Sequence, residues 1–103
     1  MKTTTRARLR RTAAEAVGSI PGIEAVVLFG SRARGAARAT SDWDVAILSH
    51  ASPDDERAAR RFFDDLAQVH PIVMKPESIE AHCNEGLRIE SAVARQGRLL
   101  AGE

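Results

Sequence analysis

The feature that most limits the fold is a short apolar run, EAVVLF at residues 24–29, which stops at Gly30 and Ser31. A run of this length with β-branched residues predicts a buried strand. Glycine lets backbone amides approach a ligand closely, and the first N–H groups of a helix attract anions. The segment therefore indicates a phosphate-binding bend, although a lone Gly-Ser pair is also typical of a plain turn with serine as helix N-cap.

A second strand, DWDVAIL at residues 42–48, is predicted after a small-residue, arginine-rich spacer. Its alternation places Asp42 and Asp44 on one face and Trp43 and Val45 on the other. Neighbours two apart on a strand have Cα atoms roughly 6.5 Å apart, so the two carboxylates can share a divalent ion. Oxygen ligands suit magnesium, which relieves the repulsion between like charges. The alternative is a pair of solvated acids at an exposed strand start.

The bend and the acid pair are more informative together than apart. A phosphate cradle at the end of one strand, followed by two acids at the start of the next, predicts a site for a metal-bound nucleotide. Three arginines in the spacer, Arg32, Arg34 and Arg38, would add positive charge for a polyphosphate, although each is also compatible with simple solvation.

The remaining segments predict helices and two further strands. Residues 4–17 have the apolar period of a helix that Gly18 can end. A second helix is expected from Ser52, its N-cap, to Val69. Its apolar positions are Ala58, Ala59, Phe62, Phe63, Leu66 and Val69. Residues 70–74 are expected to form a strand, at a sheet edge because of Pro71.

The C-terminal part predicts two short helices and a last strand. The first helix runs from Pro76 to about Cys83, the second contains Leu87, Ile89 and Val93 and ends at Gly97, and the strand contains Leu99 and Leu100. The element order indicates an α/β (α+β) fold, a small mixed sheet of three to four strands with helices packed on it. We expect one domain over residues 1–103.

Composition excludes several classes of protein. Aromatic residues make up 4% of the chain and the net charge is +1, so we expect neither a stacking platform nor a broad nucleic-acid-binding surface. A single cysteine, Cys83, excludes an internal disulfide and a cysteine-based zinc site. No apolar run reaches the length of a membrane span, and the N-terminus lacks the apolar centre of a secretory signal. We therefore expect a cytoplasmic protein.

The segment VVLFGSRARGAARATSDWDVAIL, residues 26–48, resembles the signature of the nucleotidyltransferase superfamily related to DNA polymerase β. Within it, the chain resembles the minimal nucleotidyltransferase (MNT) group. The shared pattern is an apolar strand, Gly-Ser, a spacer and Asp-x-Asp on the next strand, which implies the nucleotidyltransferase fold.

The resemblance implies a role for each matching residue. Gly30 and Ser31 would hold the triphosphate of ATP, and Asp42 and Asp44 would ligate Mg²⁺ and serve as the catalytic acids. Charge on the phosphates would be neutralised by metal and by two arginines, Arg32 and Arg34. The implied reaction is attack of an acceptor hydroxyl on the α-phosphate, with pyrophosphate leaving.

One feature departs from the family pattern. Many members carry a third acid on a later strand, but the matching strand HPIVM, residues 70–74, has none, and Ile72 falls at its place. His70 lies two residues away on the same strand face, so it is a candidate accessory ligand or base. We favour the interpretation that His70 is an ordinary strand-end residue.

The resemblance also implies a partner. Short MNT proteins are commonly antitoxins of HEPN-domain toxins, which are helical ribonucleases, and the implied reaction places AMP on a tyrosine of that toxin. The first helix and the apolar positions Leu87, Ile89 and Val93 are candidate contacts, although core packing explains them equally well. Two alternatives remain: a non-catalytic antitoxin that neutralises its partner by binding, and, more weakly supported, a nucleic-acid-binding module that uses the N-terminal arginines.

Overall fold

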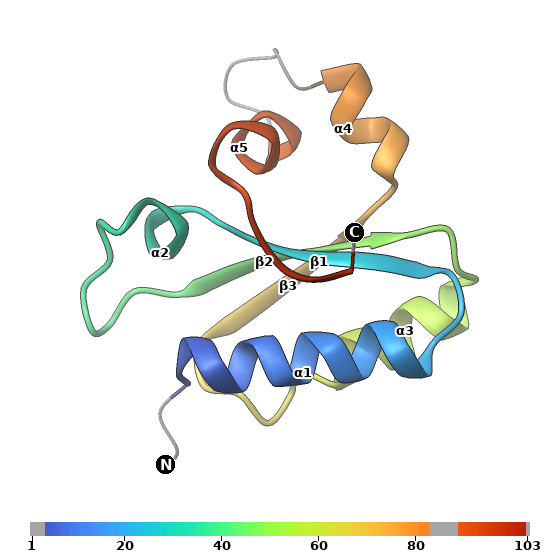
Figure 1. Cartoon of the computed structure of the whole chain (residues 1–103), viewed down its shortest axis with the longest axis horizontal. Helices are drawn as coiled ribbons and strands as arrows, with labels where there is room; N and C mark the ends of the chain where they lie inside the picture. The colour runs from blue at the N-terminus through green and yellow to red at the C-terminus, as the bar shows by residue number, and fades with distance from the viewer. Residues whose placement is uncertain (1–3, 83–88, 103) are drawn as a thin grey trace.

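The structure, a computed structural model, describes residues 4–82 and 89–102 and centres on a mixed β-sheet (Figure 1). Its elements in chain order are α1 (Arg6–Ser19), β1 (Ile23–Phe29), α2 (Ser31–Arg34), β2 (Trp43–Ser49), α3 (Pro53–Arg61), β3 (Val69–Met74), α4 (Pro76–His82), α5 (Ile89–Gln96) and β4 (Arg98–Gly102). Within this described part no helix is long and apolar enough to span a membrane.

The sheet has four strands in the order β3-β2-β1-β4. β1 pairs antiparallel with β2 and with β4, whereas β2 pairs parallel with β3. The parallel pair needs a long crossover, which α3 and the turns after it supply. Pro71 lies on the edge strand β3, as predicted. The expected α/β class with a small mixed sheet is confirmed.

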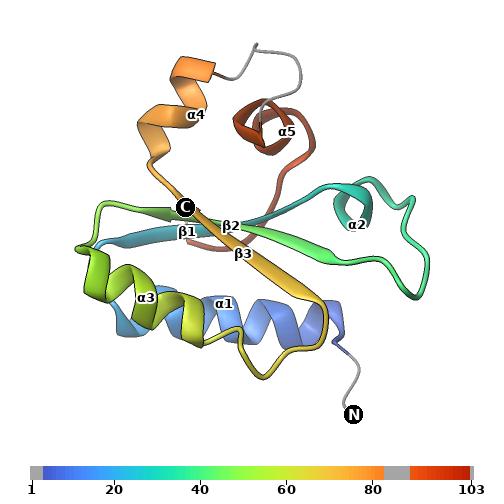
Figure 2. The ribbon, with the colours of Figure 1, turned by 180° about the vertical axis from the view of Figure 1, so that it is seen from behind.

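Helices cover both faces of the sheet. Figures 1 and 2 show α1 and α3 on one face and α4 and α5 on the other, with α2 beyond one end of β1. The face under α1 and α3 carries the larger core, where Leu9, Val26, Val45, Ile47 and Phe63 are buried together. The opposite face carries a smaller cluster whose buried members are Phe29, Ala46 and Val93.

The two strands nearest the site alternate as predicted. Trp43, Val45 and Ile47 of β2 belong to the core under α1 and α3. Side chains at alternate positions of a strand point to opposite faces, so Asp44 shares the other face with Ala46 and Leu48.

The expected boundary of α1 is wrong. The helix continues through Gly18 to Ser19 and is closed by the amide of Ile20, which donates to the Ala16 carbonyl at 3.1 Å. Ile20 is buried and Pro21 follows it, so an apolar anchor and the loss of a backbone donor end the helix instead of the glycine.

The predicted extent of α3 is also wrong. Its start is correct, since Ser52 caps the helix by accepting a hydrogen bond from the Asp55 amide. The helix ends at Arg61, however, and the next amides bond three residues back, as Phe63 does to the Arg60 carbonyl at 3.0 Å. This tighter winding keeps Phe63 and Leu66 in the core while the chain turns, which frees Val69 to begin β3 beside Trp43.

Predictions for the C-terminal part agree with the structure where it is described. α4 begins at Pro76, α5 ends just before Gly97, and β4 contains Leu99 and Leu100. Val93 is buried and Ile89 is exposed. The predictions that involve Cys83 and Leu87 lie outside the described residues.

Candidate functional site

Gly30 lies where β1 ends and α2 begins, and its backbone has φ of 77°, a region that favours glycine. A Cβ atom at this position would lie 2.5 Å from Oδ2 of Asp44. The Asp44 carboxylate therefore rests directly against the Gly30 backbone. This contact brings the Gly-Ser bend and one of the two predicted acids into the same site.

The bend presents the start of the short helix α2. The Gly30 carbonyl accepts hydrogen bonds from the amides of Ala33 and Arg34, both at 3.1 Å, and no side chain caps the helix at Gly30. The first amides of a helix, here those of Ser31 and Arg32, have no carbonyl within the helix to bond. They are the donors that the sequence predicted for a phosphate.

The two acids come from the start of β2. Asp42 precedes the strand and is exposed, and Asp44 is half-buried and pairs with Phe29 of β1. Burial raises the pKa of Asp44 above its ordinary value, the charge of Asp42 raises it further, and His70 lowers it. The carboxylates thus repel each other in a partly desolvated place, a condition that a cation relieves.

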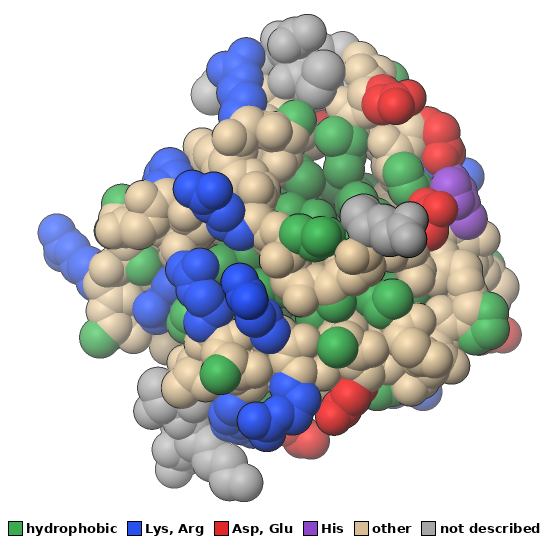
Figure 3. Space-filling view, in the orientation of Figure 1, with side chains coloured by type: hydrophobic (Ala, Val, Ile, Leu, Met, Phe, Trp, Pro, Cys, Tyr) green, Lys and Arg blue, Asp and Glu red, His purple; other side chains and the backbone are tan. Residues whose placement is uncertain are grey.

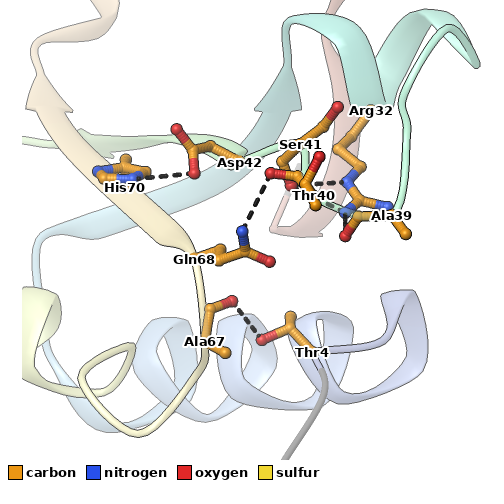
Figure 4. A network of polar contacts seen from close by, with 9 residues as sticks. All are labelled: Thr4, Arg32, Ala39, Thr40, Ser41, Asp42, Ala67, Gln68 and His70. Carbon is orange, nitrogen blue, oxygen red and sulfur yellow. Dashed lines mark hydrogen bonds and ion pairs between the residues drawn. The ribbon is translucent and has the colours of Figure 1, made fainter.

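His70 lies beside both acids. It pairs with Asp44 across the parallel strands β2 and β3, and its Nε2 is 3.4 Å from Oδ1 of Asp42 (Figure 4). Ile72, the position that matches the third acid of the family pattern, pairs with Ala46 two residues further along the strands. The structure therefore groups His70, not position 72, with the acid pair.

The donor set at this place suits a cation that shares its ligands with a substrate. Asp42 and Asp44 offer oxygen ligands, and Mg²⁺ often takes the rest of its coordination from water and phosphate. Within residues 4–82 and 89–102, no three His, Cys, Asp or Glu side chains are arranged to hold a metal ion. The two acids fit a partial magnesium site that a bound triphosphate would complete.

Arg32 is bonded to the segment that leads into β2. Its Nη2 donates to the carbonyls of Ser41, at 2.8 Å, and Ala39, at 3.3 Å, and its Nε donates to Ser41 at 3.2 Å (Figure 4). The guanidinium carbon lies 4.3 Å from the centroid of the Trp43 ring. The side chain expected to bind phosphate is thus engaged with the protein.

Arg34 and Arg38 are exposed near the bend. Nη1 of Arg34 donates to Oε1 of Gln96 at 3.2 Å, which links α2 to the end of α5. Figure 3 shows Lys and Arg side chains gathered on the side of the molecule where α2 lies, and acidic side chains with a histidine near α4. A polyphosphate at the bend would therefore meet positive charge on that side.

Sequence reasoning missed two residues of this region. Gln68 has φ of 63°, its Nε2 donates to the Thr40 carbonyl at 3.0 Å, and its own carbonyl accepts from the Trp43 amide at 2.8 Å. Thr4 donates to the Ala67 carbonyl at 2.7 Å. Neither residue belongs to a recognisable motif, because their partners are backbone carbonyls far away in the sequence.

A mixed sheet with a Gly-Ser bend and two acids beside it is the arrangement that the resemblance to nucleotidyltransferases predicted. Residues 13–102 match the family model described as "Polymerase beta, Nucleotidyltransferase". The chain belongs to this family. The resemblance to the MNT group is supported by similarity to a curated relative, the protein adenylyltransferase MntA of Aphanizomenon flos-aquae (strain 2012/KM1/D3). The match is 47% identical over 47 residues, which are 46% of this chain and 31% of that protein.

Solved structures with the same fold include a protein from Sulfolobus solfataricus assigned as a nucleotidyltransferase. It has a TM-score of 0.62 and 23% identity over 91% of this chain and 77% of that chain. A toxin–antitoxin structure with AMP-PNP has a TM-score of 0.60 and 20% identity over 97% and 75% of the two chains. A mutant of the toxin–antitoxin pair MntA–HpeT has the same TM-score with 18% identity over the same shares. At these identities the likeness shows the fold.

Proposed function

We propose that the protein transfers a nucleoside monophosphate, AMP from ATP, to a hydroxyl group of a partner protein. One observation carries the proposal: the Asp44 carboxylate lies against Gly30 at the start of α2, with Asp42 near enough to raise its pKa. Backbone amides that can donate to a phosphate and carboxylate oxygens that can bind a metal ion therefore share one site. Family membership and the MntA match support the same reaction.

In the proposed reaction the acceptor oxygen forms a bond to the α-phosphorus, and the bond from that phosphorus to the β-phosphate oxygen breaks to release pyrophosphate. The amides of Ser31 and Arg32, with the Ser31 hydroxyl, would bind the outer phosphates. Asp42 and Asp44 would hold Mg²⁺, which when bound neutralises charge on the phosphates. Asp42 Oδ1, which has His70 Nε2 at 3.4 Å, would receive the proton of the hydroxyl.

For the acceptor we propose a HEPN-type ribonuclease toxin in the same cytoplasm, with this chain as its antitoxin. The support is the resemblance to the MNT group, together with the similarity to toxin–antitoxin structures, one of which contains AMP-PNP. The exposed Ile89 and Leu99 are apolar side chains available for a partner contact. The matched segment spans under a third of MntA, so partner and acceptor residue need direct tests.

The test is to incubate the chain, the protein encoded beside it and labelled ATP with magnesium. We expect label on the partner, lost with chelator and in Asp42→Asn and Asp44→Asn. Asp64→Asn changes an exposed acid in the turns after α3 and is the matched control, which should transfer as the unchanged chain does. Transfer that persists in both site variants would contradict the proposed roles of the two acids.

A second function is favoured by one observation. No third acid accompanies Asp42 and Asp44 in the described residues, and the side chain beside them is His70. A site with two acids suits an antitoxin that neutralises its partner by binding alone. In that case partner ribonuclease activity would be inhibited without labelling, and Asp42→Asn with Asp44→Asn would leave the inhibition intact.

A further inference from the structure

The segment between α2 and β2, residues 35–42, has neither helix nor strand, yet it sets where Asp42 lies. Arg32 holds one side of this segment. Three hydrogen bonds run from its guanidinium to the carbonyls of Ala39 and Ser41 (Figure 4). The same group lies over the Trp43 ring. Asp42 is the residue between these two points of attachment, so its backbone is held on both sides.

Gln68 holds the other side. Its side-chain amide donates to the Thr40 carbonyl, and its backbone carbonyl accepts from the Trp43 amide. One residue therefore bonds the chain both before and after Asp42. The backbone of Gln68 has positive φ, which a non-glycine residue adopts only where its surroundings hold it. Thr4, just before α1, holds the neighbouring carbonyl of Ala67, which ties this turn to the main core.

We propose that Arg32 and Gln68 are positioning residues that hold Asp42 in place for the transfer step, and that Arg32 is withheld from the phosphates by this role. The proposal rests on the proposed function for its link to transfer, but its structural part stands apart from activity. If Arg32 turned to a phosphate instead, it would give up its bonds to Ala39 and Ser41 and its contact with Trp43. The charge for the phosphates then comes from other side chains of this face, of which Arg34 is the nearest in sequence.

The chemistry of the two basic side chains separates the two roles. The guanidinium is a planar fork that can bond two carbonyls and stack on an indole at once, whereas lysine is a compact point charge on a flexible stem. A lysine can neutralise phosphate but cannot reproduce the Arg32 contacts. Arg32→Lys therefore retains a phosphate-binding function and loses a positioning function.

The first experiment compares Arg32→Lys, Arg32→Ala and Arg34→Ala in the full chain. We expect both Arg32 variants to lower kcat by the same factor, about 100-fold, because small displacements of reacting groups cost that much. KM for ATP should stay within about twofold of its value in the unchanged chain, because the contacts that bind ATP before the reaction are not removed. Arg34→Ala should instead raise KM. A kcat restored by Arg32→Lys would overturn the proposal.

The second experiment does not depend on transfer. Trp43 is the chain's single tryptophan, and Arg32 lies over its ring, so its fluorescence reports this contact. Arg32→Lys and Arg32→Ala should both shift the emission and increase its quenching by acrylamide, while Arg60→Ala, an exposed arginine on α3, should do neither. Unchanged emission in both Arg32 variants would also overturn the proposal, whether or not the chain transfers AMP.

A third variant guards against simple misfolding. Gln68→Gly removes the side-chain bond to Thr40 but suits the positive φ, and because these effects oppose each other the protein should unfold at a temperature close to that of the unchanged chain. We expect it to lower kcat and alter Trp43 emission despite this stability. Full activity with unchanged emission would remove Gln68 from the proposed pair. If the unchanged chain transfers no AMP but the variants show these emission changes, the proposed function is rejected and the positioning role is kept.

Discussion

Two glycines with positive φ have different surroundings, and this difference predicts the effect of adding a methyl group. Gly30 has φ of 77° and ψ of −157°, whereas Gly35 has φ of 74° and ψ of 15°, in the left-handed helical region. A Cβ at Gly30 would meet the Asp44 carboxylate at 2.5 Å, whereas nothing lies within 4 Å of one at Gly35. Alanine at Gly35 strains the left-handed backbone by about 1–2 kcal/mol, and alanine at Gly30 meets a backbone region that is essentially restricted to glycine, at a cost of about 1–3 kcal/mol. Gly30→Ala must in addition displace Asp44.

We therefore expect Gly30→Ala to abolish transfer and to weaken binding of ATP with magnesium, while Gly35→Ala loses about 1–2 kcal/mol of stability and keeps the nucleotide. Urea unfolding measures the stability of both variants, and titration calorimetry measures ATP binding. Equal loss of ATP binding in the two variants would show that backbone strain alone, and not the contact with Asp44, accounts for the effect.

The burial of Asp44 predicts that its ionised carboxylate, which the proposed function needs, lowers the stability of the fold. Its pKa is raised in the folded state, chiefly by burial and then by Asp42, so its ionised form is disfavoured there. A raised pKa means that the stabilising contribution is complete below the ordinary value of 3.8 and is lost as pH rises through the folded value. At neutral pH the fold carries this penalty. Asp44→Asn should therefore raise the free energy of unfolding at neutral pH.

Urea unfolding of Asp44→Asn and the unchanged chain at neutral pH and below pH 3.8 measures this difference. The gain in stability should shrink in acid, and magnesium with ATP should stabilise the unchanged chain but not the variant. A variant less stable than the unchanged chain at neutral pH would show that the Asp44 carboxylate makes favourable contacts that outweigh its desolvation.

The sequence placed part of this site and not the rest. Gly30, Ser31, Asp42 and Asp44 were predicted together because strand period and a local turn decide their positions, and the structure brings the bend and Asp44 into contact. The contacts of Arg32 were not predictable, because they lead to carbonyls in a segment without regular structure. Whether these residues bind nucleotide stays a prediction.

At the scale of elements, the strands and the start of α3 were predictable, and the ends of α1 and α3 were not. The apolar spacing of Phe62, Phe63 and Leu66 is helical, and these side chains do pack on the core. The chain nevertheless leaves the helix after Arg61, because Val69 must reach Trp43 to begin the parallel pair. Periodicity reports which side chains are buried, but a sheet partner distant in sequence decides where the helix stops.

A cluster around His50 joins three elements and predicts that the attachment of α4 to the sheet depends on pH. His50 follows β2, its Nδ1 is 3.1 Å from Oε2 of Glu24 on β1, and its Nε2 bonds Glu77 in the first turn of α4. The bond to Glu77 is the main cause that raises the pKa of His50, with Glu24 assisting and Lys75 opposing. The same bond lowers the pKa of Glu77. The charged pair therefore ties α4 to the sheet.

The pKa shifts of His50 and Glu77 define the pH range in which their pair stabilises α4. The His50 contribution is complete below its ordinary value of 6.5 and is lost as pH rises through the raised pKa. The Glu77 contribution is complete above 4.5 and is lost as pH falls through the lowered pKa. Hydrogen exchange of α4 should thus be slowest, relative to its intrinsic rate, between pH 4.5 and 6.5. His50→Gln should remove the high-pH loss, and an unaltered profile would exclude this role.

For the whole molecule, the two faces of the sheet are stabilised unequally. The face under α1 and α3 holds Leu9, Leu28, Val45 and Phe63 with almost no exposure. The opposite face is covered by two short helices and leaves several of its apolar side chains half-buried: Val27, Leu48, Ile72, Met74, Ile79 and Ala92. Segments with few buried contacts open locally at a lower free energy than the global one.

This asymmetry predicts the order of opening measured by hydrogen exchange. Amides of α4 and α5 should exchange through local opening, while those of β1 and β2 should need global unfolding. Val93→Ala, in the smaller cluster, should accelerate exchange in α4 and α5 with little effect on the strands. Leu9→Ala, in the larger core, should lower the global free energy of unfolding by about 2–5 kcal/mol and accelerate exchange throughout. Because Gly30 and Asp44 are attached to β1 and β2, the candidate site should persist while α4 and α5 open; uniform protection across all elements would reject this division of the molecule.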